Sequence, residues 1–420
     1  MKKLLLLSIS LLLLFVNKSS ATWSTTPPIT GLYRIDGLYF TSTSTGYLIG
    51  NTDMLNQGTG KIAKTTNGGT SWTVVKSLSS TSFSDIYFVN STNTGFVVGS
   101  GGLILKTTDG GNNWAQQVSN TTEALESVFF LDVNNGYAGG GSEVEIMLKT
   151  TDGGVHWDSL IIPNGYSQRI HGMFFTSTTI GYAIGGDPFG GGDGNISHTT
   201  NGGVSWDTLP SGVKSYFDDV CFINANTGFI VGYHGLILKT TNAGQSWTKK
   251  NAPNNEEITK IRFASSTVGY ACNLNGEILK TFDAGEHWII DVSTPAISEF
   301  YAISFPSADI GYAAGLSMVC FKMNGASNQG VQENQTEIDN ISLFPNPCQH
   351  FLNITIQNTY NEWNNIEIFN IEGQVIFCKQ IEKSVGEIKE TINIENYPKG
   401  IYIFRILGNN AVKNEKIVIN

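Results

Sequence analysis

The sequence predicts an all-β protein, namely a seven-bladed β-propeller closed by its own N-terminal strand and followed by a small C-terminal β-sandwich. A nine-residue stretch ending in tryptophan occurs six times, with successive tryptophans 41 to 49 residues apart. In the same region, a short apolar run that ends in phenylalanine is followed a few residues later by a Gly-Tyr or Gly-Phe pair, and this arrangement occurs seven times. The repeat stops after residue 326, and from Ile341 onward apolar and polar residues alternate. A repeat of about 40 to 45 residues with four short β-prone runs is typical of a propeller blade.

Composition excludes several classes of function. Charged residues make up only 14% of the chain, the net charge is −10, and only four residues are arginine. Nucleic-acid binding needs a basic face that neutralises phosphates, and none is visible. The five cysteines form no CxxC pair, so a zinc site of that type is excluded. We expect Cys221 and Cys320 to be small buried side chains, and we predict no metal and no cofactor.

Residues 1–21 have the pattern of a secretory signal peptide. Lys2 and Lys3 precede an apolar run over residues 4–16, and small residues follow at 19–21. The run is too short to span a bilayer. No later stretch is apolar enough to cross a membrane, so we expect no transmembrane segment in the mature chain.

Residues 22–326 repeat one pattern. Each unit begins with a short apolar run that ends in phenylalanine, as in GLYF at 37–40, and continues with the Gly-aromatic pair. A third run such as LILK at 103–106 and a tryptophan-bearing run complete it. Short runs divided by Gly, Asn and Asp are typical of strands and turns. Each unit is therefore expected to be a four-stranded blade.

The seventh unit lacks its tryptophan-bearing run. The N-terminus instead carries an additional tryptophan, Trp23, which lies 17 residues before Phe40, much as Trp72 lies 16 residues before Phe88. We therefore expect residues 22–30 to supply the last strand of the seventh blade. This arrangement closes the ring, so that no blade keeps an unpaired edge.

The six tryptophan-bearing stretches share the pattern Thr-x-Asp/Asn-x-Gly-x-x-Trp. An Asp or Asn side chain can accept hydrogen bonds from backbone N–H groups of a turn, and glycine can adopt a positive φ. Calcium ligation or acid catalysis is the alternative, but it would not tolerate the three asparagines. We therefore assign the shared acidic or amide position a structural role; its members are Asn67, Asp109, Asp152, Asn201, Asn242 and Asp283.

The chain after the repeats divides into a linker and a second domain. Residues 327–339 are polar and are predicted to be a linker. Residues 340–420 alternate apolar and polar residues at period two, which predicts the strands of a β-sandwich.

These motifs resemble known families. The repeated Thr-x-Asp-x-Gly-x-x-Trp pattern resembles the Asp-box of bacterial neuraminidase repeats. The wider pattern of residues 22–326 resembles the propellers of photosystem II assembly and stability factors, without implying a photosystem role. Residues 340–420 resemble a type IX secretion sorting domain of the Bacteroidota, with FPNP at 344–347, KGIY at 399–402 and KIV at 416–418. That resemblance implies Sec export, contact with the type IX machinery, and a secreted or cell-surface location.

The predicted ligand site lies at the starts of the inner strands. In Asp-box propellers the hairpin turns occupy one face and ligands use the other. Counting six residues back from each inner-strand phenylalanine gives one ring of positions, occupied by Arg34, Ser82, Ala124, Arg169, Tyr216, Glu257 and Glu299. We predict ligand binding by Arg34, Arg169, Tyr216, Glu257 and Glu299, beside the long loops at 51–60 and 186–195. A guanidinium there could bind a carboxylate at two points.

Other interpretations of this ring stay open. Each arginine could instead pair with Glu257, Glu299 or Asp36. Asp187 and Asp193 could hold calcium or simply form a turn, and His171 could be an acid–base group.

The favoured function is therefore a secreted or cell-surface binding module for an unknown protein or glycan. The alternative is a sialidase-like glycoside hydrolase, which needs three clustered arginines, an acid and a tyrosine–glutamate pair. Arg262 lies out of register with Arg34 and Arg169, and no Arg-Pro motif is present, so catalysis is the less favoured interpretation. A purely structural surface protein is the third.

Overall fold

The computed structural model describes most of the chain. The described residues are 22–27, 29, 31–53, 58–141, 145–160, 169–186, 194–293, 299–316, 320–324, 341–358, 363–370, 375–381, 386–395, 397–408 and 412–420. The predicted signal peptide (1–21) and the predicted linker (327–339) lie outside them, as do Asp187 and Asp193.

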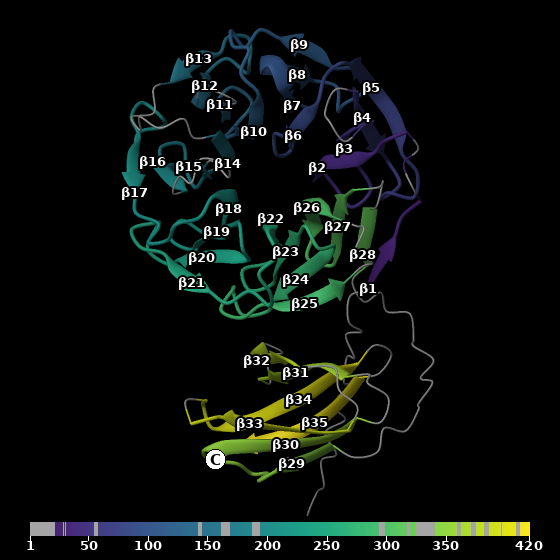
Figure 1. The fold of residues 1–420 in the computed structure, drawn as a ribbon, viewed down its shortest axis with the longest axis vertical. Helices are drawn as coiled ribbons and strands as arrows, with labels where there is room; N and C mark the ends of the chain where they lie inside the picture. Colours follow the sequence, from purple (N-terminus) through teal and green to yellow (C-terminus); the bar gives the residue numbers. More distant parts are fainter. Residues whose placement is uncertain are drawn as a thin grey trace, which may run out of the picture.

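Seven four-stranded antiparallel sheets form a closed ring (Figure 1). Blade 1 contains β2 (Arg34–Phe40), β3 (Gly46–Asn51), β4 (Thr59–Thr65) and β5 (Thr73–Ser79). Blade 2 contains β6 (Phe83–Phe88), β7 (Gly95–Gly99), β8 (Leu103–Thr107) and β9 (Ala115–Gln117). Blade 3 contains β10 (Leu125–Phe130), β11 (Gly136–Gly141), β12 (Glu145–Thr150) and β13 (Asp158–Leu160). Blade 4 contains β14 (Arg169–Phe175), β15 (Gly181–Gly186), β16 (Asn195–Thr199) and β17 (Asp207–Leu209).

The remaining blades follow the same order. Blade 5 contains β18 (Phe217–Phe222), β19 (Gly228–Gly232), β20 (Leu236–Thr240) and β21 (Thr248–Lys250). Blade 6 contains β22 (Ile258–Phe263), β23 (Gly269–Asn273), β24 (Glu277–Thr281) and β25 (Ile289–Ser293). Blade 7 contains β26 (Phe300–Ser307), β27 (Ile310–Gly315), β28 (Cys320–Asn324) and, from the other end of the chain, β1 (Thr22–Thr25).

The N-terminal strand closes the ring, which confirms the sequence prediction. β1 pairs antiparallel with β28, and Trp23 lies opposite Met323. The Trp23 ring packs edge-on against Phe305 at 6.3 Å, as Trp114 packs against Phe88 at 5.9 Å. Trp23 therefore occupies in blade 7 the position that a hairpin tryptophan occupies in each other blade.

The Gly-aromatic pairs join neighbouring blades. The aromatic ring of each pair stacks on the inner-strand phenylalanine of the next blade, as Tyr47 does on Phe88 at 4.1 Å. The seven stacked pairs are Phe40–Tyr312, Tyr47–Phe88, Phe96–Phe130, Tyr137–Phe175, Tyr182–Phe222, Phe229–Phe263 and Tyr270–Phe305. The glycine leaves room for the phenylalanine of its own blade, because a Cβ on Gly181 would lie 2.3 Å from the Phe175 ring.

The hairpin turns are held by their own side chains. The Thr107 hydroxyl donates to Asp109 Oδ1 at 2.8 Å and accepts from the Gly111 N–H at 2.9 Å. Asp109 Oδ1 also accepts from the Asn113 N–H at 3.0 Å, and Asn67 Oδ1 accepts from the Ser71 N–H at 2.9 Å in the same way. A neutral amide therefore folds the turn as a carboxylate does.

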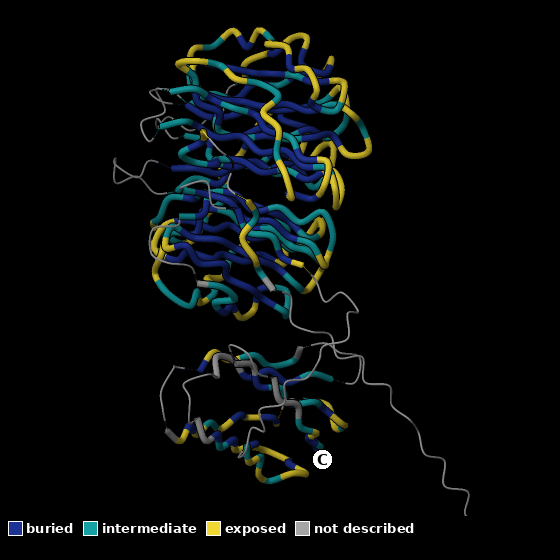
Figure 2. The backbone as a smooth tube through the Cα atoms, turned by 90° about the vertical axis from the view of Figure 1, so that its right-hand side faces the viewer, coloured by how far each residue is buried: buried dark blue, intermediate teal, exposed yellow. Residues whose placement is uncertain are grey.

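Burial follows this architecture. Figure 2 shows buried segments within the bodies of the sheets and exposed segments at the turns. Cys221 and Cys320 are 5% and 1% exposed, and all five cysteines are free thiols, which confirms the expected role of these two as buried side chains.

The C-terminal strands form two sheets around a separate core. One sheet contains β29 (Ile341–Phe344), β30 (Phe351–Asn358) and β33 (Gly386–Asn393). The other contains β32 (Val375–Gln380), β31 (Trp363–Phe369), β34 (Gly400–Gly408) and β35 (Val412–Ile419). Ile354, Ile366, Phe404 and Ile417 belong to the shared core, so this is the predicted sandwich. Among the described residues, no helix has the length and apolarity needed to span a membrane.

Candidate functional site

Seven inner strands lie around the central axis of the ring (Figure 1); they are β2, β6, β10, β14, β18, β22 and β26. The region along this axis is called the channel. In β2 and β14 the partly exposed positions lie six, four and one residues before the terminal phenylalanine. Side chains alternate along a strand, so the positions at six and four share a face. Every inner strand has a register shift at the position four residues before the phenylalanine, which returns the position at one to that face.

The channel wall therefore has three tiers. The upper tier is the predicted ring: Arg34, Ser82, Ala124, Arg169, Tyr216, Glu257 and Glu299. The middle tier contains Asp36, Ser84, Glu126, His171, Asp218, Thr259 and Tyr301. The lower tier contains Tyr39, Tyr87, Phe129, Phe174, Cys221, Arg262 and Ser304. The sequence analysis named Asp36 and His171 of the middle tier and missed the others, although the period of two in each strand was the available signal.

Arg34 already has partners at the upper mouth, which is the end of the channel that the upper tier lines. Its Nε lies 2.5 Å from Asp36 Oδ1, and its guanidinium lies over the Tyr301 ring at 5.1 Å from the centroid. Asn51 Nδ2 donates to the other oxygen of Asp36 at 2.6 Å. Burial raises the pKa of Asp36 to about 6, although Arg34 opposes that shift. For Arg34, the alternative of pairing with Asp36 is therefore what the structure has.

Arg169 differs from Arg34. It starts β14 and is partly exposed, and its side chain makes no ion pair or hydrogen bond with any residue that the structure describes. The neighbouring channel residue His171 is engaged, since its Nδ1 lies 2.8 Å from Glu126 Oε2 and its Nε2 lies 3.3 Å from Gly186 O. Arg169 is therefore a cation in the channel mouth that the described residues leave available.

The two upper-tier glutamates accept hydrogen bonds from tyrosines. The Tyr216 hydroxyl donates to Glu257 Oε2 at 2.5 Å, and the Tyr301 hydroxyl donates to Glu299 Oε2. Burial, followed by the bond to Glu257, raises the pKa of Tyr216, so its phenol stays protonated. Neither glutamate forms an ion pair with an arginine among the described residues.

Two adjacent aspartates on β18 have opposite environments. Asp219 Oδ2 accepts from the Ile261 N–H at 2.9 Å and from Arg262 Nη1, and Lys260 Nζ lies 3.8 Å from its Oδ1. Asp218 Oδ2 is buried and has no hydrogen-bond partner among the residues that the structure describes. Burial, reinforced by the nearby Glu257 carboxylate, raises the pKa of Asp218 well above its ordinary value. Arg262 is thus held on the lower tier, away from the tier of Arg34 and Arg169.

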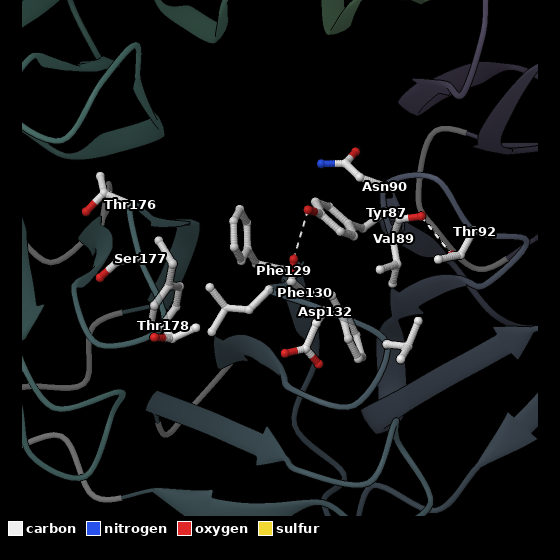
Figure 3. Close-up of a pocket in the computed structure, with 13 residues that line it drawn as sticks. Tyr87, Val89, Asn90, Thr92, Phe129, Phe130, Asp132, Thr176, Ser177 and Thr178 are labelled. Carbon is white, nitrogen blue, oxygen red and sulfur yellow. Dashed lines mark hydrogen bonds between the residues drawn. The ribbon is translucent and has the colours of Figure 1, made fainter.

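The described cavity lies at the opposite mouth, beside the hairpin turns. It has a volume of about 500 Å³ and is lined by residues of blades 2, 3 and 4, including Tyr87 and Phe129 (Figure 3). The Tyr87 hydroxyl is already bonded to Phe130 O at 2.9 Å. This cavity is separate from the predicted ring of residues. Among the described residues, no group of three His, Cys, Asp or Glu side chains could hold a metal ion.

Comparison with known proteins identifies the family. The model of the Photosynthesis system II assembly factor YCF48 family matches residues 17–118, 64–208 and 196–273, which together exceed half of the chain. The chain belongs to this family. A second model, the Secretion system C-terminal sorting domain, matches residues 342–420. A search of curated proteins found no match.

Solved structures of YCF48 share this fold. The chain superposes on YCF48 bound to D1 peptide with a TM-score of 0.59 and 19% identity, covering 72% of this chain and 96% of that one. For YCF48 from Cyanidioschyzon merolae the TM-score is 0.58 and the sequence identity 18%, and the match covers 72% of this chain and 98% of that one. For streptogramin B lyase the TM-score is 0.57 and the sequence identity 13%, and the match covers 73% of this chain and 98% of that one. At these identities the likeness concerns the fold alone. The sorting domain indicates export of the YCF48-family propeller to the cell surface or beyond.

Proposed function

We propose that this YCF48-family protein is an exported binding module that takes a peptide or protein segment at the upper mouth of its propeller. In this proposal Arg34, Arg169, Tyr216, Glu257 and Glu299 line the site, and Arg169 anchors a carboxylate of the ligand. The observation that carries the proposal is that Arg169 has no partner among the described residues, whereas Arg34 is bound to Asp36.

The chemistry of the mouth supports this choice of ligand. A guanidinium presents several N–H donors in one plane and can hold a carboxylate by two parallel bonds. The paired Arg34 and the tyrosine-bound glutamates give a rigid polar wall around it. A related propeller, YCF48, is known bound to D1 peptide, which is in line with a peptide ligand.

The proposed route of export uses both ends of the chain. Residues 1–21 would direct Sec export, and residues 340–420 would then engage the type IX machinery of a Bacteroidota cell. Deleting residues 342–420 in such a host should leave the propeller inside the cell envelope. Fractionation that finds the truncated protein in the medium would contradict this route.

A binding screen with matched variants tests the ligand proposal. We expect peptides with a free carboxylate to bind the purified protein, and Arg169→Gln to weaken that binding by about 10-fold or more, the value of a charged hydrogen bond. Lys249→Gln, an equal charge change on the exposed outer strand of blade 5, should leave binding unchanged. Equal affinity of parent and Arg169→Gln would reject the site.

A second candidate function is glycoside hydrolysis of the sialidase type. The bond between the Tyr216 hydroxyl and Glu257 favours it, because sialidases use a tyrosine nucleophile. If this is the activity, the protein should release the fluorophore from a fluorogenic sialoside and Tyr216→Phe should abolish release. No release by the parent protein would exclude it.

A further inference from the structure

We propose that Asp218 and Glu257 form a cation subsite in the channel, which receives an ammonium or guanidinium group of the bound ligand. This subsite deepens the proposed binding function and rests on it for the identity of the whole ligand. It gives a role to the carboxylates of Asp218 and Glu257, which a ligand carboxylate bound at Arg169 does not explain.

Asp218 is unusual among the buried aspartates of the inner strands. Asp219 and Asp85 each accept a backbone N–H of the next blade, from Ile261 and Val128, both at 2.9 Å. Those two carboxylates hold neighbouring blades together. Asp218 occupies the middle tier instead, and within the described part of the chain its buried Oδ2 has no hydrogen-bond partner. A buried carboxylate without a partner is costly for a fold, so its presence in the channel wall requires a reason beyond stability.

The groups around Asp218 favour a cation over an anion. Glu257 is the carboxylate that acts most strongly on it, and Glu126 and Asp219 add further negative charge. Lys260 is the one cation that opposes them in this set, and it lies 3.8 Å from Asp219. An ammonium or guanidinium between Asp218 and Glu257 would meet this negative charge, and its binding would release the proton that the raised pKa of Asp218 retains.

Aromatic rings complete the subsite. The Tyr216 hydroxyl is bonded to Glu257 at 2.5 Å, and its ring stacks on Tyr233 with centroids 5.0 Å apart. Tyr233 is 41% exposed, so its ring is open to solvent at the rim. Tyrosine faces attract organic cations, and they would shield the alkyl part of such a group from water.

The other carboxylates of the two upper tiers already have partners within the protein, and the partner of Glu299 is the Tyr301 hydroxyl. Asp36 is paired with Arg34, and Glu126 with His171. Arg169 lies next to the subsite. It pairs with Gly186 across blade 4, and Gly186 packs so closely on Tyr216 of blade 5 that a Cβ added to Gly186 would lie 2.8 Å from Tyr216 Cβ. One ligand can therefore present a carboxylate to Arg169 and a cation to Asp218, as a peptide with a lysine or arginine does.

The test compares two small probes of matched shape. N-acetyl-lysine methylamide carries the cation, and N-acetyl-norleucine methylamide lacks it. We expect the lysine probe to bind the full-length protein about 10-fold more tightly, as ligand-observed NMR titration would measure. Asp218→Asn should bring the two affinities within about twofold, whereas Asp158→Asn, the same charge change on the exposed start of β13, should preserve the difference.

The outcomes separate this subsite from the proposed function. A lysine preference that persists in Asp218→Asn, or no preference in the parent protein, overturns the subsite. Peptide binding that depends on Arg169 but ignores lysine would overturn the subsite alone. Conversely, an Asp218-dependent lysine preference without any peptide binding would support the subsite and reject the peptide-binding proposal. Putrescine as a third probe distinguishes a free amine from a peptide side chain, since the free amine would then bind more tightly than the lysine probe.

Discussion

A single buried hydroxyl holds the turn of each tryptophan hairpin. Thr107 is 1% exposed, and its Oγ1 bonds both Asp109 and the Gly111 N–H. Thr107→Val keeps the shape but leaves that N–H unsatisfied, so we expect a loss of about 1–3 kcal/mol in the free energy of unfolding. Denaturant titration would measure it. Thr108→Val, on the exposed neighbour, is the control, and equal losses in both variants would show that the bond contributes nothing.

Asp218 should make the folded protein less stable as pH rises. Burial raises its pKa in the folded state above the unfolded value, so the folded state binds the proton more tightly. The resulting stability is present below the unfolded pKa and is lost as pH rises through the folded pKa. Asp218→Asn should therefore raise the melting temperature at neutral pH and change it little near pH 3 (roughly one unit below the ordinary pKa). A variant that melts below the parent at neutral pH would contradict this.

The inner strands show what the sequence could and could not predict. The upper tier follows from counting back from each phenylalanine, because every inner strand has its register shift at the same distance before that phenylalanine. Most of the middle tier was not predicted, although the alternation of side chains along a strand places it two residues after the upper tier. The hydrogen-bond partners of the channel residues could not be predicted either, because a bond such as that between Tyr216 and Glu257 joins residues of different blades that are 41 positions apart. Nothing local distinguishes Asp218 from Asp219, although only Asp219 meets Arg262.

The second strand of each blade depends on a glycine that accommodates the adjacent phenylalanine. In Gly181→Ala the new Cβ would lie 2.3 Å from the Phe175 ring, which must move and disturb its stack on Tyr137. We expect a loss of about 1–3 kcal/mol in unfolding free energy, the usual cost of overpacking a core. Gly400→Ala is the matched control, because its Cβ would meet Tyr402 at an ordinary 3.8 Å. The proposal fails if both variants melt like the parent.

The two mouths of the propeller differ in chemistry across the whole molecule. The upper mouth gathers charged and phenolic groups, whereas aromatic rings of the lower tier pack against one another at tilted angles, as Tyr87 and Phe129 do with centroids 5.2 Å apart. Inner-strand runs such as DIYF at 85–88 indicated the aromatic residues. The cavity beside them depends on how three blades meet, which no single repeat encodes.

Closure of the ring depends on Trp23, so its loss should destabilise blades 6 and 7, which are far from the N-terminus in sequence. Its indole N–H donates to Asp291 in blade 6 at 2.8 Å, while its ring packs on Phe305 in blade 7 and its strand pairs with β28. Trp23→Ala removes contacts with two blades at once, so we expect a loss of about 3 kcal/mol in unfolding free energy.

Hydrogen exchange distinguishes ring opening from a local loss of packing. If Trp23 closes the ring, Trp23→Ala should speed amide exchange throughout β28, because the partner of that strand is released. Trp72→Ala supplies the comparison: Trp72 packs on Phe40 within blade 1, where the backbone connects all four strands. Its loss should destabilise the protein but leave exchange in β28 slow. Since only blade 7 is built from both ends of the chain, fast exchange in β28 confined to Trp23→Ala would identify closure itself as the source of the stability.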